Sequence, residues 1–386
     1  MTMVTALTHA RIFDGERWHD NSALLIDGSK VAGIAAKDDV APGTELVDCA
    51  NAIIVPGFID LQVNGGGGVM LNDDRSVDGI AKICAAHARF GTTGLLPTLI
   101  TDTPEITASA IEAGLEAQQA RVPGLLGLHL EGPHLSLARK GTHHPALIRP
   151  MENGDLERIL AVANRFETLM ITVAPENATL EQVKALAEAG FVVSLGHTDA
   201  PYETARAYAE AGARVVTHLF NAMSPLENRS PGLVGTALDL GQLSSGIIAD
   251  GFHVHPASMG AAIRAKRGPG RIFIVTDAMS TIGTDLDGLT LNGRQIYRKD
   301  GRLTLADGTL AGADIDMLSS VLFVHRTLGI DFEEAVRMAS LYPAQAVGIA
   351  SRKGLLTSGY DADFVVLDTD FQMKSTWIGG ERVFEA

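Results

Sequence analysis

Eight short apolar segments, separated by amphipathic segments, are the feature of this 386-residue sequence that most limits its fold. The alternation begins at residue 53 and is typical of β-α units, which place parallel strands in one sheet covered by helices. The predicted strands are Ile53–Leu61, Thr92–Thr98, Leu125–Glu131, Leu169–Ala174, Phe191–His197, Val215–Leu219, Gly246–Asp250 and Arg271–Asp277. Eight such units predict an α/β protein whose strands close into a (β/α)₈ barrel of the TIM type.

Helical patterns lie between most of these strands, and each ends near a glycine that can terminate a helix. The clearest are Val77–Phe90, Pro104–Arg121, Leu180–Ala189 and Tyr202–Ala211. Two further helical stretches, Ile315–Leu328 and Phe332–Val347, follow the eighth strand.

The two ends of the chain have a different pattern, in which Asp-Gly and Gly-Ser pairs separate β-rich segments. Residues 1–52 and 351–386 share it, which predicts one small β-sandwich domain built from both ends. Residues 53–350 then form the barrel, with a β-hairpin insertion at about 286–311 beside its mouth.

The charge of the chain limits its partners. A formal net charge of −15 argues against nucleic acid and against an anionic membrane surface. The N-terminus lacks a basic segment followed by a long apolar one, and no apolar stretch approaches 18 residues, so we expect a cytoplasmic protein. The two cysteines, Cys49 and Cys84, lie in unrelated segments and predict buried free thiols. An anionic substrate would need a local cation.

Polar residues follow several of the predicted strands directly, at the barrel end where active sites form. Glu131, His197 and His218 make up one carboxylate and two imidazoles, the three-ligand set with which a catalytic zinc keeps one position open for water. A single polar residue at the end of a strand usually has only a structural role, in which its side chain is hydrogen-bonded. Their joint placement favours a hydrolase site, in which Asp277 can take a proton from water and return it to a leaving nitrogen.

Three other features carry weaker signals. His253 and His255 have the spacing of a chelating pair, but we favour a substrate contact by one of them and a structural role for the other. Gly65–Gly68 indicates flexible backbone rather than a phosphate loop. Arg229, in the loop after the sixth strand, is a candidate anion contact, although a lone loop arginine usually faces solvent.

Six motifs, in this order along the chain, resemble those of the N-acetylglucosamine-6-phosphate deacetylases of the amidohydrolase superfamily. They are Pro56–Asp60 (PGFID), His129–Pro133 (HLEGP), Ser194–Thr198 (SLGHT), Thr217–Met223 (THLFNAM), Asp250–Val254 (DGFHV) and Val275–Met279 (VTDAM). The resemblance spans nearly the whole chain. It implies hydrolysis of the acetamide of a phosphorylated N-acetyl amino sugar, in amino-sugar catabolism or cell-wall recycling.

The resemblance also implies roles for single residues. Glu131, His197 and His218 would hold one divalent metal per subunit, zinc in the first place, with Fe²⁺, Co²⁺ or Mn²⁺ as alternatives. Asp277 would be the general base and acid, and His143 would polarise the substrate carbonyl.

Substrate contacts follow from the same resemblance. His253 matches a contact to a sugar hydroxyl, and Asn221, Ala222 and Arg229 match the phosphate site. The arginine of that site comes from the neighbouring subunit in the family, which implies a homodimer.

Two departures from wider patterns bear on the site. The first strand offers Gln62 and Asn64 where two-metal amidohydrolases carry a pair of histidines, so we expect one metal, with both amides in supporting positions. Asp314 and Asp316 stand where the family usually has small or hydroxyl residues, and they leave the sugar preference open.

Two other functions remain possible readings of the sequence. A cyclic amidohydrolase would share the fold, but it usually needs the histidine pair on the first strand and a carbamylated lysine. A barrel that has lost its metal and serves in assembly would not be expected to keep Glu131, His197, His218 and Asp277 together.

Overall fold

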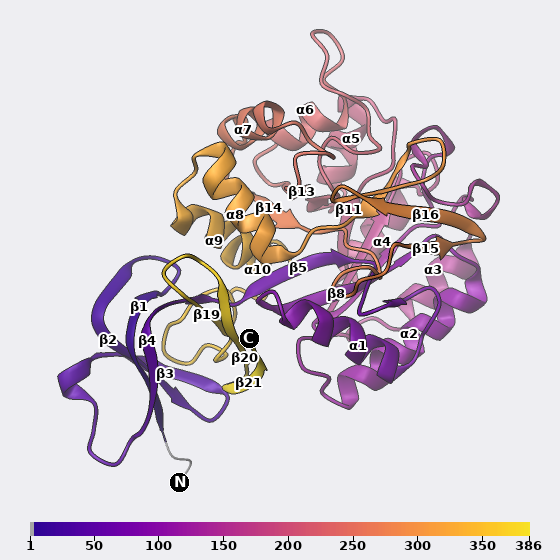
Figure 1. Cartoon of the computed structure of the whole chain (residues 1–386). Coiled ribbons are helices and arrows are strands. Elements are labelled where there is room, and N and C mark those ends of the chain that lie inside the picture. The colour runs from indigo at the N-terminus through magenta and orange to yellow at the C-terminus, as the bar shows by residue number, and fades with distance from the viewer. Residues whose placement is uncertain (1–3) are drawn as a thin grey trace.

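The computed structural model describes residues 4–386 and has a barrel at its centre (Figure 1). Eight parallel strands follow one another around it in sequence order. They are β5 (Phe58–Val63), β8 (Thr92–Ile100), β9 (Gly127–Glu131), β10 (Thr168–Val173), β11 (Val192–Leu195), β12 (Val215–Val216), β13 (Ser244–Ile248) and β14 (Ile272–Val275). The ring closes where Asp277 N–H donates to the Gln62 carbonyl at 3.0 Å, beside a parallel bridge between Val63 and Ala278. The predicted (β/α)₈ fold is confirmed.

Helices surround this barrel (Figure 1). The first seven are α1 (Val77–Ala88), α2 (Pro104–Gln119), α3 (Asn153–Leu160), α4 (Leu180–Glu188), α5 (Tyr202–Glu210), α6 (Gly232–Asp239) and α7 (Pro256–Ala265). Side chains at several N-termini satisfy free backbone donors, as Ser76 does for Gly79 and Thr179 for Gln182. Short 3₁₀ turns are η1 (Lys37–Asp39), η2 (Leu137–Arg139) and η3 (Pro145–Leu147). None of the helices in residues 4–386 is long and apolar enough to cross a membrane.

The C-terminal helices differ from the sequence prediction in one respect. Helix α8 (Met317–Leu328) is close to its predicted range, but the stretch predicted as one helix from Phe332 to Val347 is divided at Ser340. It forms α9 (Phe332–Ala339) and α10 (Leu341–Ala346). Pro343 has no N–H to donate to the carbonyl four residues earlier, so an unbroken helix would lose a hydrogen bond there.

The two ends of the chain meet in one seven-stranded sheet beside the barrel (Figure 1). Its order is β21-β20-β19-β4-β1-β2-β3. The strands are β1 (Thr5–Phe13), β2 (Trp18–Asp27), β3 (Lys30–Ala36), β4 (Glu45–Pro56), β19 (Phe364–Leu367), β20 (Met373–Ile378) and β21 (Glu381–Glu385). Central β4 pairs with β1 from the N-terminal segment and with β19 from the C-terminal one, so the small β domain requires both ends.

The segment predicted as the first barrel strand, Ile53–Leu61, is shared between two sheets. Residues 53–56 end β4 in the small sheet, and the barrel strand β5 begins at Phe58. Gly57 lies between them, where a Cβ atom would stand 2.1 Å from the Thr93 hydroxyl oxygen. Only glycine therefore fits where the chain passes from one sheet to the other.

A four-stranded antiparallel sheet takes the place of the predicted hairpin beside the barrel mouth. It consists of β15 (Gly288–Leu291), β16 (Arg294–Lys299), β17 (Arg302–Thr304) and β18 (Leu310–Ala313), while β6 (Gly65–Gly66) and β7 (Val69–Met70) form a short hairpin nearby. Ala313 N–H donates to the Asp277 carbonyl at 2.9 Å, which fixes β18 to the end of the last barrel strand.

The two acids after β18 serve this attachment. The Asp314 carboxylate pairs with Arg298 Nε of β16 at 2.7 Å and accepts from the Thr281 hydroxyl at 3.0 Å. Asp316 caps the N-terminus of α8 by accepting from Ser319 N–H at 2.8 Å. Neither residue lines the cavity at the barrel mouth. Asp314 and Asp316 therefore have no direct contact with a sugar in this cavity through which they would change the sugar preference.

Candidate active site

A cavity of about 230 Å³ opens at the C-terminal ends of the barrel strands. Polar side chains from five different strand ends line it, together with residues of β18 and of the loop after β9. The polar lining residues include Asn64, Glu131, His143, His197, His218, Asn221, His253 and Asp277. Closure of the barrel thus brings together side chains that are more than 200 residues apart in the sequence.

Glu131, His197 and His218 form the tightest cluster in this cavity. The Glu131 Oε1 atom lies 3.3 Å from His197 Nε2 and 3.2 Å from His218 Nε2, and the two nitrogens are 3.0 Å apart. All three residues are buried. Burial alone would raise the pKa of Glu131, but hydrogen bonds and charge from His197 and His218 outweigh it and hold the pKa well below its usual range. Glu131 is therefore a carboxylate.

The protonation of His197 supports a metal site. Its Nδ1 atom lies 2.9 Å from the Arg139 carbonyl, which can only accept, so Nδ1 carries a proton, and in the neutral ring Nε2 presents a lone pair. That lone pair faces His218 Nε2 and the Glu131 carboxylate at hydrogen-bond distance. This lone pair and the carboxylate oxygens converge on one point, which a cation stabilises; in the metal-free chain Glu131 raises the pKa of His218 against the effect of burial, so a proton on His218 can take that place. One carboxylate and two imidazoles suit a divalent metal of the zinc class.

His143 lies beside this cluster with the opposite tautomer. Its ligand atom also falls within 4.8 Å of those of Glu131 and His197, which would allow a different ligand set. However, the Thr101 backbone N–H donates to His143 Nδ1 at 3.3 Å, and the Thr101 hydroxyl, 2.7 Å from the same atom, is placed to donate as well, so Nδ1 is an acceptor and the proton is on Nε2. Burial and the neighbouring His197 lower the pKa of His143 to about 3, which keeps the ring neutral. A neutral Nε2–H that faces the cavity is a hydrogen-bond donor rather than a ligand.

Asp277 lines the same cavity and is held by two amides. Its Oδ1 atom accepts from Asn64 Nδ2 at 2.7 Å and from Gln62 Nε2 at 3.2 Å, and Gln62 Nε2 also donates to Glu131 Oε1 at 2.9 Å. Burial and the charge of Glu131 raise the pKa of Asp277 above its usual value. Both amides present N–H groups to carboxylates, and an N–H group is not a metal ligand. This arrangement fits the supporting role expected from the sequence.

Three of these residues have an unusual backbone conformation. His197, His218 and Asp277 each follow a barrel strand and have positive φ angles of 46°, 28° and 55°. Non-glycine residues in this region cost about 1–3 kcal/mol each and tend to cluster at functional sites. The left-handed turn directs each side chain into the barrel mouth instead of along the strand.

The histidines of the 253–255 pair point to different places. His253 lines the cavity, and its Nδ1 atom lies 2.5 Å from the Asp250 carboxylate. His255 is exposed and caps helix α7 by accepting from Ala257 N–H at 3.2 Å. The two rings are therefore not placed as a chelating pair. His253 faces the space in which a substrate would bind.

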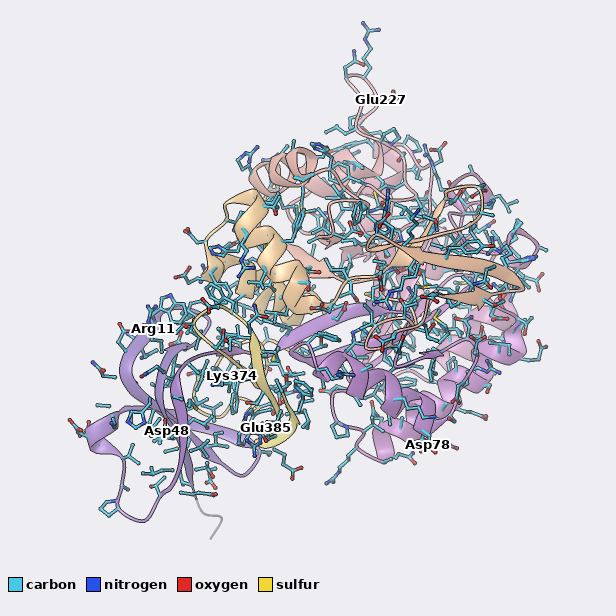
Figure 2. All side chains as sticks on the ribbon, in the orientation of Figure 1. Arg11, Asp48, Asp78, Glu227, Lys374 and Glu385 are labelled. Carbon is cyan, nitrogen blue, oxygen red and sulfur yellow. The ribbon has the colours of Figure 1, made fainter. Side chains whose placement is uncertain are left out.

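The residues expected to bind phosphate separate into two groups. Asn221 and Ala222 line the cavity, but Arg229 lies on an exposed loop between α5 and α6. Figure 2 labels Glu227 on this loop, which projects away from the barrel. Among residues 4–386, no lysine or arginine lines the cavity, and Arg229 forms no ion pair. The subunit's own cavity thus lacks a cationic side chain for a phosphate.

Sequence reasoning did not single out Thr101 or Asp250. Thr101 sets the tautomer of His143, and Asp250 orients His253. Both directly follow apolar strand segments, the second and the seventh, so the rule that selected Glu131 could have found them.

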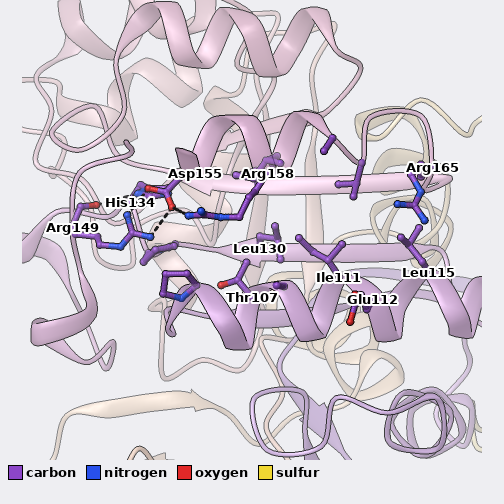
Figure 3. A pocket seen from close by; sticks show the side chains of 18 residues that line it. Thr107, Ile111, Glu112, Leu115, Leu130, His134, Arg149, Asp155, Arg158 and Arg165 are labelled. Carbon is purple, nitrogen blue, oxygen red and sulfur yellow. Dashed lines mark hydrogen bonds and ion pairs between the residues drawn. The ribbon is translucent and has the colours of Figure 1, made fainter. Parts of the chain in front are cut away.

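A cavity of about 320 Å³ lies outside the barrel wall, between α2 and α3 (Figure 3). Apolar side chains such as Ile111, Leu115 and Leu130 line most of it. At one end Asp155 accepts from Arg149 Nη2 at 2.7 Å and also pairs with Arg158, so these charges satisfy one another. It holds no set of carboxylate and imidazole groups like that of the barrel mouth.

Comparisons with known proteins agree with this geometry. The amidohydrolase family model matches residues 53–383. The N-acetylgalactosamine-6-phosphate deacetylase of Shewanella sp. (strain ANA-3) is 42% identical over 86% of this chain and 84% of that protein. The N-acetylglucosamine-6-phosphate deacetylase of Haemophilus influenzae is 36% identical over 93% of this chain and 94% of that protein. The crystal structure of N-acetylglucosamine-6-phosphate deacetylase from Pasteurella multocida has a TM-score of 0.94 at 35% identity and covers 98% of this chain and 99% of that one.

Proposed function

The chain belongs to the amidohydrolase family, and we propose that it hydrolyses the acetamide of N-acetylglucosamine 6-phosphate to glucosamine 6-phosphate and acetate. The observation that carries the proposal is the convergence of Glu131, His197 and His218 beside Asp277 at the barrel mouth. Deacetylases of this substrate are similar to this chain in sequence, at 35–36% identity, and in fold, over 93–98% of its length.

Glu131, His197 and His218 are the residues that would hold the metal, for which we propose zinc, one ion per subunit. When bound there, a zinc ion supplies a Lewis acid that makes water acidic near neutral pH. The first strand adds no second set of ligands, because Gln62 and Asn64 direct their N–H groups at carboxylates. This arrangement supports a single-metal hydrolase over a cyclic amidohydrolase with two metals and a bridging lysine.

Asp277 would take the proton of the attacking water and then give it to the sugar nitrogen. Its raised pKa suits both steps, since a more basic carboxylate accepts a proton more readily and remains able to release it. Protonation of the nitrogen is needed because an amide anion is too poor a leaving group. His143 Nε2–H would donate to the acetamide oxygen as negative charge develops on it.

Other residues that line the cavity would bind the sugar and its phosphate. His253, oriented by Asp250, would contact a sugar hydroxyl, and Asn221 with Ala222 would contact the phosphate. The charge of the phosphate would be met by Arg229 of a second copy of this chain, so we propose a homodimer. The projecting loop and the lack of a cationic side chain in the cavity, among the residues described, support this proposal.

The galacto epimer is a second candidate substrate. A relative that is 42% identical to this chain is an N-acetylgalactosamine-6-phosphate deacetylase, and the N-acetylglucosamine-6-phosphate deacetylase of Haemophilus influenzae is 36% identical. Both sugars carry the acetamide and the phosphate at the same positions and differ only in the orientation of one hydroxyl group.

Acetate release by the zinc-loaded protein tests the proposal. We expect rapid release from N-acetylglucosamine 6-phosphate and much slower release from N-acetylglucosamine, because the second substrate lacks the phosphate. N-Acetylgalactosamine 6-phosphate, assayed beside them, shows which epimer has the higher kcat/KM. Failure of both phosphorylated sugars to yield acetate would refute the proposed function.

A further inference from the structure

The layer of side chains directly beneath the metal-site residues is polar. TIM barrels usually fill this space with branched apolar side chains. Here five fully buried polar residues occupy it, and we call them the hydroxyl chain: Thr98, His129, Thr172, Ser194 and Thr217. Buried hydroxyl and imidazole groups are unfavourable unless each is hydrogen-bonded, so a polar layer at this place requires an explanation.

The hydroxyl chain has a defined direction at its first end. The Thr98 hydroxyl donates to the Leu96 carbonyl at 3.2 Å, which uses its only proton. His129 Nδ1 lies 3.3 Å from the same hydroxyl oxygen and must therefore be the donor. The neutral ring then carries its proton on Nδ1, and its Nε2 atom is an acceptor.

The rest of the chain follows from that acceptor. The Thr172 hydroxyl lies 2.7 Å from His129 Nε2 and donates to it. The Thr217 hydroxyl is 2.7 Å from Thr172 and donates in turn, and the Ser194 hydroxyl at 2.6 Å donates to Thr217. Every hydroxyl proton is used once. The chain is fully satisfied only if each strand keeps its position relative to the others.

The strand that holds the first metal-site residue is tied to the chain. His129 lies two residues before Glu131 on β9, so both side chains point into the barrel. Directly after Glu131, Gly132 N–H donates to the Thr172 carbonyl at 3.2 Å. Two hydrogen bonds with Thr172 thus fix the position of Glu131. One involves the side chain of His129, before Glu131, and the other the backbone of Gly132, after it.

The two histidines are tied to the same residues. Thr217 directly precedes His218, and Gly196 directly precedes His197. A Cβ atom at Gly196 would lie 2.9 Å from both Thr172 Cγ2 and Thr217 Cβ, so this glycine packs closely on the chain. Thr172 therefore touches the supports of all three metal-site side chains.

We propose that the hydroxyl chain sets the spacing of Glu131, His197 and His218 for a divalent cation, with Thr172 as the positioning residue at its centre. Three side chains from three strands must converge to within 3.0–3.3 Å, and directional hydrogen bonds fix that spacing better than an apolar layer would. The inference rests on the proposed metal site.

The test compares two isosteric substitutions on one strand. Thr172→Val breaks the chain at its centre. Thr168→Val is the matched control, since Thr168 is also buried on β10, four residues earlier, and its hydroxyl has no partner among residues 4–386. Zinc affinity is measured by competition with a chelator, and the geometry of the site by the visible absorption spectrum of the Co²⁺-loaded protein. Thr172→Ser restores the hydroxyl.

Thr172→Val should bind zinc about 10–100-fold more weakly, which is the typical loss when a residue that orients a metal ligand is replaced. The absorption bands of its Co²⁺-loaded form should also shift. Thr168→Val and Thr172→Ser should keep the wild-type affinity and spectrum. Equal behaviour of Thr172→Val and Thr168→Val would overturn the inference. If Thr172→Val does not fold, Ser194→Ala, which removes only the last donor, must still weaken zinc binding, and wild-type affinity there would overturn it too. Wild-type protein that binds no metal would instead refute the proposed function.

Discussion

Replacement of Asp277 by asparagine removes a proton acceptor while keeping its neighbours in place. The Asp277 Oδ1 atom accepts from Asn64 Nδ2 at 2.7 Å and from Gln62 Nε2 at 3.2 Å. An asparagine carbonyl oxygen can accept both bonds, because it occupies the same position and also has two lone pairs. The amide nitrogen then stands where the second carboxylate oxygen was. The variant should fold and bind metal as the wild type does.

The expected loss of rate follows from the two proton transfers assigned to this residue. General acid–base catalysis by one side chain is worth about 10²–10⁴-fold. We therefore expect kcat for Asp277→Asn to fall at least about 10²-fold, or about 2.7 kcal/mol in activation free energy at about 1.36 kcal/mol per factor of ten. KM should change little, because the contacts that hold the sugar and its phosphate before reaction are assigned to His253, Asn221 and Ala222 rather than to Asp277.

The pH profile provides an independent readout. A base acts in its charged form, and the pKa of Asp277 is raised by burial and by Glu131. Wild-type kcat/KM should thus be lost as the pH falls through a value above 3.8, the ordinary value for aspartate. In Asp277→Asn, the decrease of kcat/KM at low pH that results from protonation of Asp277 should be absent.

The assay measures acetate release under steady-state conditions. The metal content of the same samples is measured by plasma mass spectrometry. Asp316→Asn is a matched control, because asparagine caps a helix as well as aspartate and Asp316 does not line the cavity. It should retain the wild-type kcat. Near-normal turnover by metal-loaded Asp277→Asn would refute the assignment, and loss of metal from that variant would refute the argument that its neighbours stay in place.

Three further outcomes are expected. Arg229→Ala should raise KM strongly for the phosphorylated sugar and barely change activity on the unphosphorylated one, whereas equal losses on both would contradict a phosphate role. Protein reconstituted with excess zinc and then desalted should hold one zinc per chain by plasma mass spectrometry, and Glu131→Ala should hold none; a stable ratio of two would contradict this. Burial raises the pKa of Asp60 from 3.8 to about 7, so its neutral form stabilises the fold at low pH, and this contribution is lost as the pH rises from about 4 to about 7. In metal-free protein, denaturant unfolding at pH 5 and pH 8 should therefore show a smaller decrease in stability for Asp60→Asn than for the wild type, and equal decreases would show that Asp60 is not shifted.

The sequence predicted the barrel because its signals are local. Apolar segments bounded by glycine, proline or polar residues mark each strand, and every predicted barrel strand overlaps an observed one. The same local rule found Glu131, His197, His218 and Asp277, since the residue after a parallel strand must lie at one end of the barrel. It would also have found Thr101 and Asp250 if applied to every strand. The limits of Ile53–Leu61 and of the last predicted helix were wrong, because contact with Thr93 in space and a missing N–H at Pro343 decided them.

Tertiary structure decided what each of these residues can do. The Arg139 carbonyl places the proton of His197 on Nδ1, and the Thr101 N–H places that of His143 on Nε2. One ring is thereby suited to bind a metal, and the other to donate to a substrate. Neither partner follows from the spacing of residues in the sequence.

The amides of the first strand and the acids after β18 give the same lesson. Gln62 and Asn64 reach Asp277, more than 200 residues later, only because the barrel closes there, and Asp314 is engaged by Arg298 of the neighbouring sheet. Strand and helix patterns depend on residues a few positions apart, so the sequence by itself determined the barrel and which side chains gather at its mouth. Hydrogen-bond pairing depends on which groups meet after closure, so the folded chain alone determined the tautomers, the left-handed turns and the polar layer beneath the site.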